Sequence, residues 1–131
     1  MTNQINELAQ QQLKDYRSIN PGTCFSEPDF SLEISEAYAV QDEVARLRVQ
    51  DGERVIGYKV GCTGPGTTKL FGMKGPIRGI LFDKEVLENG VKVDPNSFCN
   101  LSIEAEMAIK VGENGQILSV FPVIELHNFV F

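Results

Sequence analysis

Three glutamates, Glu104, Glu106 and Glu125, have the residue type and the spacing to bind a hard divalent cation. Glu104 and Glu106 are two positions apart, which places their side chains on the same face of a β-strand. Glu125 follows on the far side of Asn114–Gly115, a dipeptide typical of a tight hairpin turn. Carboxylates that oppose each other across two strands repel, and a cation between them removes that repulsion. Mg²⁺ and Mn²⁺ are the candidates, because both bind carboxylate oxygens together with water.

Two expected strands, residues 102–111 and 116–126, must position these glutamates. Both segments alternate polar and apolar residues, which is the period of a half-buried strand. If Asn114–Gly115 supplies the two turn residues, the strands pair as an antiparallel ribbon. Carried along the ladder, that register places Glu104 directly opposite Glu125.

The predicted register divides the side chains of this ribbon into two faces. The apolar face, which we expect to be a core face, holds Ile103, Ala105, Met107, Ile109, Val111, Leu118, Val120, Pro122, Ile124 and Leu126. The polar face holds Ser102, Glu104, Glu106, Lys110, Ser119, Glu125 and His127. There are two alternatives. The polar face can be simply the solvated side of a sheet, and Pro122, which cannot donate to the ladder, can mark a bulge that shifts the register.

Composition limits the class of protein. The chain has 131 residues, 42% of them hydrophobic, which suits one globular domain, residues 1–131. Twelve basic against eighteen acidic residues give a net charge of −6, which argues against nucleic acid and membrane surfaces as partners. An odd number of cysteines without a CxxC pair favours a reducing cytoplasm over a disulfide framework or a structural zinc site.

The remaining periodicity predicts two helices followed mainly by strands, an α+β pattern. The predicted helices cover residues 3–17 and 35–49, the second with Ser35 as N-cap. Further strands are predicted at residues 54–60, 77–82 and 91–93. The segment 61–75, with five glycines, is expected to be a flexible loop. It lacks the Gly-Lys-Ser/Thr spacing of a phosphate-binding loop.

Three other side chains could take part in chemistry. Lys59 lies in an apolar strand, where it can be an acid/base of shifted pKa, a cationic substrate anchor, or simply an exposed lysine. His127, the only histidine, shares the glutamate face, but a lone histidine near a chain end is more often a surface residue than a ligand. Cys62 has no histidine near it in sequence, which argues against a nucleophilic role.

Five segments in order make the chain resemble a known family. They are Ala37–Gln41, Gly57–Thr63, Gly79–Asp83, Ile103–Ala108 and Pro122–Leu126. Together they resemble the 2-keto-4-pentenoate hydratase family, which includes 4-oxalocrotonate decarboxylases, within the fumarylacetoacetate hydrolase superfamily. The resemblance covers about residues 3–128. It implies N-terminal helices, residues 3–50, followed by a mixed β-roll, residues 53–131, that is incomplete because members of the family are considerably longer.

The resemblance also implies a site and an activity. Glu104, Glu106 and Glu125 correspond to the family's ligands for Mg²⁺ or Mn²⁺, and Lys59 corresponds to its active-site acid/base and anchor. The implied function is a divalent-metal-dependent lyase, a hydratase or a decarboxylase, for small 2-oxo or 2-hydroxydienoate acids. The alternative is a non-catalytic relative, or a fragment of the fold, that acts as a binding or assembly module. We also expect a homo-oligomer, since an incomplete roll has a sheet edge that another chain can cover.

Overall fold

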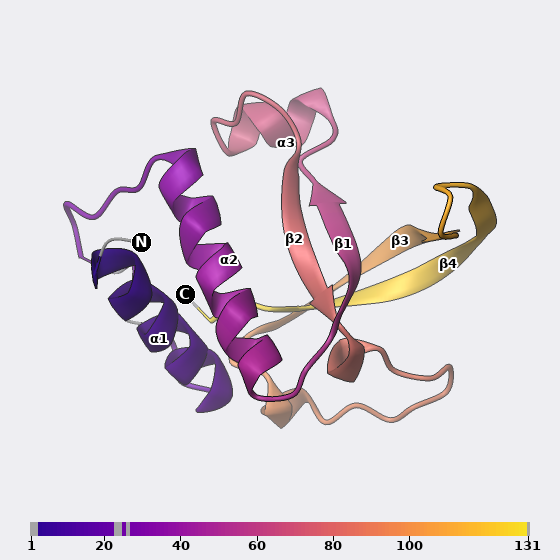
Figure 1. Cartoon of the computed structure of the whole chain (residues 1–131), viewed down its shortest axis with the longest axis horizontal. Coiled ribbons are helices and arrows are strands. Elements are labelled where there is room, and N and C mark those ends of the chain that lie inside the picture. Colours follow the sequence, from indigo (N-terminus) through magenta and orange to yellow (C-terminus); the bar gives the residue numbers. More distant parts are fainter. Residues whose placement is uncertain (1–2, 23–24, 26, 131) are drawn as a thin grey trace.

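The computed structural model describes residues 3–22, 25 and 27–130 as a pair of helices, two strand pairs and short helical segments (Figure 1). In chain order the elements are α1 (Asn3–Arg17), α2 (Ile34–Gln50), β1 (Val55–Gly61), α3 (Pro65–Leu70), β2 (Ile77–Phe82), β3 (Leu101–Val111) and β4 (Ile117–Asn128). Two 3₁₀ turns, Asp83–Glu85 and Pro95–Ser97, lie between β2 and β3. Helices followed mainly by strands agree with the predicted α+β pattern. None of the described helices combines the length and the apolar character needed to cross a membrane.

The hydrophobic core lies between α1 and α2. α1 has the predicted bounds, and Ile5, Ala9 and Leu13 recur along one face of the helix and are buried. Ile5 and Ala9 pack against Val40 of α2, which is 2% exposed. Partly buried side chains surround this contact: Leu8, Phe25, Leu32, Ala39, Val44 and Leu47. The helical periodicity of the sequence therefore identifies the side chains that form the core.

The start of α2 differs from the prediction. The helix begins at Ile34, and its N-cap residue is Glu33, not Ser35. The backbone N–H of Glu33 donates to Glu36 Oε2 at 3.0 Å, as in a capping box. Both carboxylates then lie at the positive end of the helix dipole, which favours Glu33 as the N-cap over Ser35, two residues later.

Arg48 joins the end of α2 to the end of β2. Its guanidinium pairs with Glu53 Oε2 at 2.6 Å and Glu85 Oε1 at 2.8 Å. It also lies 3.6 Å from the centre of the Phe82 ring and 5.4 Å from that of Tyr16. Arg48 is only 8% exposed, so both ion pairs and both cation–π contacts are largely shielded from water.

β1 and β2 form an antiparallel hairpin whose connection is more ordered than predicted. β2 has the predicted bounds, and β1 begins and ends one residue later than expected. The connection contains α3, so the prediction of a flexible loop is wrong over residues 65–70. Pro65 starts this helix, where its missing N–H costs nothing, and the hydroxyls of Thr67 and Thr68 donate to the Gly64 carbonyl at 3.0 and 3.1 Å.

β3 and β4 form the ribbon, with the predicted register but a different turn. Glu104 lies opposite Glu125, as expected. The turn is a three-residue loop: the Gly112 N–H donates to the Gln116 carbonyl, and only Gly115 has positive φ, at 77°. That loop shifts the register by one residue, and a bulge at Leu118 shifts it back. The predicted two-residue turn is therefore wrong, and the alternative of a bulge at Pro122 is wrong as well.

The apolar face of the ribbon does not form the predicted core. Its exposed members are Ile103, Ala105, Met107, Ile109, Val111, Leu118, Val120, Pro122 and Ile124. Ile124 is 65% exposed, whereas Glu125 beside it is half-buried. The reason is that the polar face turns toward β1–β2, and no described element of this chain packs on the apolar one.

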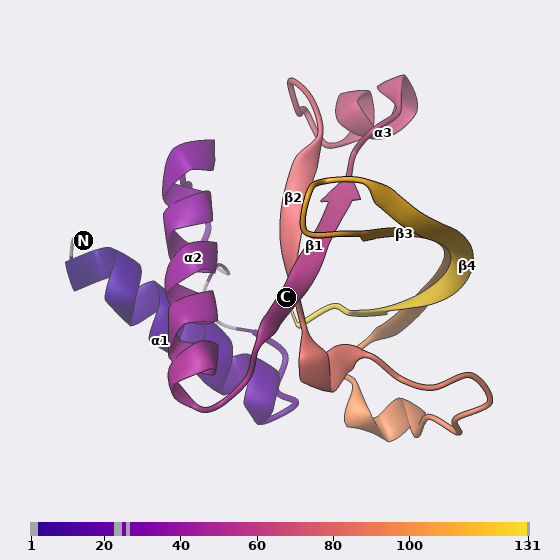
Figure 2. The same cartoon turned by 45° about the vertical axis from the view of Figure 1, so that its right-hand side comes forward.

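The elements lie in three layers, with β1–β2 between the helices and the ribbon (Figures 1 and 2). α2 contacts β2 on one side, and the ribbon lies on the other side with its hairpin end extending away from the helices. The long connection from β2 to β3 is a loop with turns. The strand predicted at residues 91–93 is not among the described strands, because Val91 donates its N–H to the Glu88 carbonyl in a turn.

Candidate metal centre

The ribbon gathers Glu104, Glu106, Glu125 and His127 on one face. Glu104 and Glu106 are two residues apart on β3, and Glu125 and His127 are two residues apart on β4, so each pair shares a face. The register brings the two pairs together. Glu106, Glu125 and His127 are half-buried, and Glu104 is exposed. The polar face is therefore the partly enclosed side of the ribbon and not its solvated side.

Lys59 reaches this face from the middle of β1. Its Nζ donates to Glu106 Oε1 at 2.6 Å and also to Glu125 Oε2. The side chain of Lys59 is 24% exposed, so it is not the exposed strand lysine of the simplest alternative. Its ammonium group lies between two carboxylates that would otherwise repel. The sequence-predicted site residues of the two hairpins are thus brought together in space.

The carboxylates also change the pKa of Lys59. Burial lowers the pKa of the ammonium group, but hydrogen bonds and attraction from Glu106 and Glu125 outweigh it, so the net pKa is raised. The hydrogen bond from Lys59 in turn lowers the pKa of Glu106. A lysine with raised pKa is a cation at neutral pH, which suits an anchor or a proton donor better than a base.

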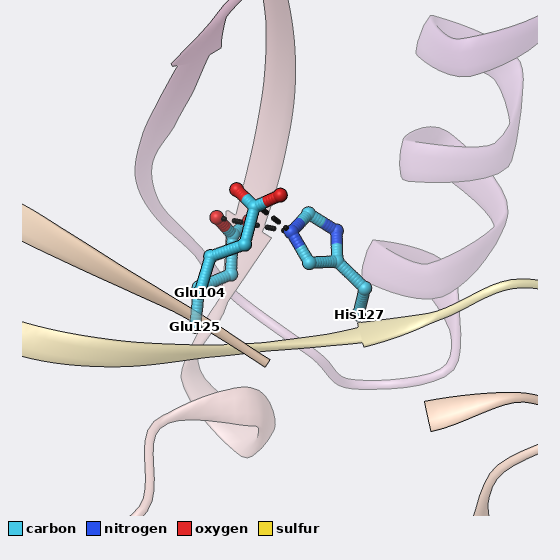
Figure 3. Close-up of side chains that lie close together, drawn as sticks. All are labelled: Glu104, Glu125 and His127. Carbon is cyan, nitrogen blue, oxygen red and sulfur yellow. Dashed lines mark ion pairs between the residues drawn. The ribbon is translucent and has the colours of Figure 1, made fainter. Parts of the chain in front are cut away.

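His127 is closer to the glutamates than its sequence position indicated. Its Nε2 lies 3.3 Å from Glu104 Oε2 and 3.4 Å from Glu125 Oε2, and both side chains point toward it (Figure 3). The nitrogen is buried but makes no hydrogen bond. The interpretation of His127 as a surface residue is therefore wrong for this atom. The signal that could have placed it was the shared strand face with Glu125, two residues away.

The donor set of this face suits a divalent cation. Glu104, Glu125 and His127 each offer one ligand atom, and these atoms lie within 4.8 Å of one another. Carboxylate oxygens are ligands for Mg²⁺ and Mn²⁺, and an imidazole nitrogen is a ligand for first-row transition ions. Glu106 stands next to them, paired with Lys59. His127 Nε2 lies within this group without a hydrogen-bond partner.

Cys62 does not join the cluster. Among the described residues, the group of side chains spaced for an ion contains no cysteine. Cys62 is half-buried with a free thiol, and it follows β1 in a backbone conformation with φ of 53°.

Sequence comparison finds relatives that are hydratases and decarboxylases of small organic acids. No family model matches the chain. Its sequence is 31% identical over 78 residues to 4-oxalocrotonate decarboxylase of Pseudomonas putida, which covers 60% of this chain and 30% of that protein. It is 37% identical over 73 residues to 2-keto-4-pentenoate hydratase of Burkholderia vietnamiensis, which covers 56% of this chain and 28% of that protein. A longer match, 27% identical over 126 residues, is to 2-oxo-hept-4-ene-1,7-dioate hydratase of Escherichia coli.

Solved structures agree with the sequence matches. The structure of 4-oxalocrotonate decarboxylase from Pseudomonas putida G7 complexed with magnesium and adipate matches with a TM-score of 0.87 and 25% identity. That match covers 100% of this chain and 55% of the decarboxylase. The same enzyme complexed with calcium and acetate matches with a TM-score of 0.86. The chain therefore spans about half the length of the relatives that it matches.

Proposed function

The chain is homologous to 2-keto-4-pentenoate hydratases and 4-oxalocrotonate decarboxylases, and on that premise we propose that it is part of a divalent-metal-dependent lyase. Its substrates would be small 2-oxo or 2-hydroxydienoate acids. Glu104, Glu106 and Glu125 would hold Mg²⁺ or Mn²⁺, and Lys59 would be the active-site lysine. The observation that carries the proposal is the contact of Lys59 with Glu106 and Glu125 across two hairpins.

The matched structures support the cofactor and the kind of ligand. The decarboxylase was solved with magnesium in one case and with calcium in the other, and its organic ligands are the carboxylates adipate and acetate. A hard cation beside a lysine is a suitable receptor for a small 2-oxo acid, because both groups attract its negative charge. This chain places Lys59 beside the carboxylates that would hold such a cation.

The residues of the chain have separable roles in this mechanism. A bound divalent ion supplies Lewis-acid polarisation of a substrate carbonyl. Glu104, Glu106 and Glu125 provide the oxygens that hold the ion. Lys59, a cation at neutral pH, would pair with the substrate carboxylate or donate its Nζ proton to the dienol. Addition of water would then complete a hydratase cycle, and loss of carbon dioxide a decarboxylase cycle.

Calorimetry with MgCl₂ tests the ion site. We expect the full 131-residue chain to bind Mg²⁺ and Glu106→Ala to bind it at least tenfold more weakly, while Glu113→Ala in the exposed hairpin loop binds as the wild type does. Equal binding in wild type and Glu106→Ala would remove Glu106 from the site. Loss of 2-hydroxypenta-2,4-dienoate absorbance, together with released carbon dioxide from 4-oxalocrotonate, distinguishes the two reactions.

A second candidate function is a binding or assembly module. The exposed apolar face of the ribbon favours it, because a patch of this kind on a soluble protein marks an interaction surface. We propose that this face associates with a second copy of the chain. Sedimentation at increasing concentration should show dimers or larger species, and Ile124→Lys should reduce them. Association without turnover of either acid would favour the module over the enzyme.

We also propose that the described elements form one domain, with helices over residues 3–50 and part of a mixed β-roll over residues 53–131. The two curved hairpins that follow the helices support this assignment (Figure 2). We place the protein in the cytoplasm, as its cysteines suggest, without nucleic acid or membrane as partner. Free thiols at Cys62 and Cys99 are compatible with that compartment.

A further inference from the structure

One nitrogen of the His127 imidazole is buried without a hydrogen-bond partner. This nitrogen, Nε2, faces two carboxylate oxygens at 3.3 and 3.4 Å and makes no hydrogen bond with either of them. Buried polar atoms normally have a partner, since an unpaired one loses its interaction with water and gains nothing in return. A direct N–H donation to Glu104 or Glu125 would be the simplest partner, and the geometry does not provide it.

The distances from His127 Nε2 to the two carboxylates are those of neighbouring ligands around one ion. Donors at about 2.0–2.2 Å from a metal lie roughly 3.0–3.4 Å apart in octahedral and tetrahedral geometries. The two distances from Nε2 fall in this range. One ion placed between the three side chains would give Nε2 a partner and bind Glu104 and Glu125, whose ligand atoms lie within 4.8 Å of one another and of Nε2.

An aromatic ring packs against the face of the imidazole and holds its orientation. The Phe129 ring stacks on it, with centroids 5.5 Å apart and an interplanar angle of 11°. The strand end is held as well, because Phe129 donates its N–H to the Asn100 carbonyl at 3.0 Å and Asn128 Oδ1 accepts from the Cys99 N–H at 2.8 Å. Nε2 is thus presented to Glu104 and Glu125 by contacts that do not involve an ion.

We propose that His127 Nε2 is a ligand of the divalent ion and that it makes the site select first-row transition ions over Mg²⁺. This inference rests on the ion site of the proposed function and adds a nitrogen donor to its carboxylates. Mg²⁺ prefers an all-oxygen set, whereas Co²⁺, Zn²⁺ and Fe²⁺ bind imidazole well. Mn²⁺ accepts both kinds of donor, so it should lie between the two groups.

The single histidine of the sequence permits a test without any substitution. In ¹⁵N-labelled wild-type protein, all imidazole nitrogen signals come from His127. Addition of one equivalent of ZnCl₂ should shift the Nε2 resonance strongly and the Nδ1 resonance little. Zinc that binds by calorimetry but leaves Nε2 unshifted would overturn the proposal, and the carboxylate site would stand.

Calorimetry with CoCl₂ and MgCl₂ tests the selectivity. In wild type, Co²⁺ should bind more tightly than Mg²⁺. His127→Ala should weaken Co²⁺ binding by about tenfold to a hundredfold, the size of effect that even indirect partners of a metal have. The same substitution should change the Mg²⁺ affinity much less. Glu113→Ala should change neither the Co²⁺ affinity nor the Mg²⁺ affinity. Equal loss of both ions would overturn the selectivity, and no binding of either ion to wild type would overturn the proposed function too.

Discussion

The helical pair and the ribbon use their apolar residues in opposite ways. In α1 and α2, apolar side chains at helical spacing face each other, and Ile5, Ala9 and Val40 are buried. In the ribbon, the alternating apolar residues face solvent, and the glutamates are on the partly enclosed side. Periodicity reveals that an element has two faces, but the residues of the neighbouring elements decide which face is covered. In this chain the neighbour of the ribbon is a strand that carries Lys59.

The largest expected effect contrasts the same residue type in the two regions. Ile5→Ala should lower the free energy of unfolding by about 3 kcal/mol, because it leaves a cavity between α1 and α2. Ile124→Ala should lower it by less than about 0.5 kcal/mol, since its side chain is 65% exposed. Urea unfolding of both variants measures the difference at a concentration where the chain is monomeric. Similar losses in the two variants would mean that the ribbon face is covered in solution.

A second contrast concerns charge within the helical side of the molecule. Arg48→Met should destabilise the chain by about 2 kcal/mol, because it leaves Glu53 and Glu85 without the cation that they share. Arg54→Met is the matched control and should have a much smaller effect, as the Arg54 side chain is 81% exposed. Thermal unfolding of both variants checks this. If both substitutions lowered the stability by a similar amount, the shielding of the Arg48 ion pairs from water would contribute little to that stability.

A third experiment removes the lysine of β1 that pairs with the ribbon's glutamates. Lys59→Met should lower the melting temperature by a few degrees in EDTA, because Glu106 and Glu125 then repel without compensation. MgCl₂ should stabilise this variant more than wild type, since a bound ion replaces the missing charge. Lys110→Met, an exposed lysine on the same ribbon, is the control. A stabilisation by MgCl₂ that is the same in all three proteins would contradict an ion between these glutamates.

The smallest expected effect is a pH dependence outside both regions. The Arg54 backbone N–H and then its guanidinium hold the pKa of Asp83 below its usual value. A lowered folded-state pKa adds stability above the unfolded pKa, about 3.9, and this stability is lost as the pH falls through the folded-state value. The stability difference between wild type and Asp83→Asn should therefore be constant from pH 5 to 7 and shrink below about pH 4. Urea unfolding across this range measures it, and a constant difference would contradict the assignment.

Local sequence patterns predicted where helices and strands lie better than they predicted how those elements pack against one another. The bounds of α1 and β2 follow from periodicity and were predicted. The opposition of Glu104 and Glu125 was also predicted, but from a two-residue turn that is wrong; it holds because the bulge at Leu118 offsets the longer loop. The short helix α3 was not, because its stability comes from Pro65 and local threonine bonds within a glycine-rich segment. Residues 91–93 have strand propensity but no strand partner among the described elements, so propensity alone did not suffice.

In the candidate site, too, the sequence predicted positions within strands but not the packing between them. The shared face of Glu104, Glu106 and Glu125 was predicted from spacing, and Lys59 was singled out within its strand. The contact between them was implied only by family resemblance, because no sequence rule reports how two hairpins pack. His127 was undervalued for a similar reason. Its strand position was known, but the burial of one nitrogen depends on Phe129 and on the two glutamates together.

The bulge at Leu118 separates the hairpin loop from the glutamates in a way that matters for engineering. It absorbs the one-residue offset of the loop before the ladder reaches Glu125. A replacement of residues 113–115 by another three-residue loop, or a grafted peptide with closely spaced ends, should leave the ligand geometry intact. Deletion of Leu118 should remove the bulge and leave the opposition of Glu104 and Glu125 intact, because Ile117 and Ser119 already pair with the neighbouring residues Val111 and Lys110. The loop is therefore an insertion point for tags or probes, and the ladder from the Lys110–Ser119 pair onward is the part to preserve.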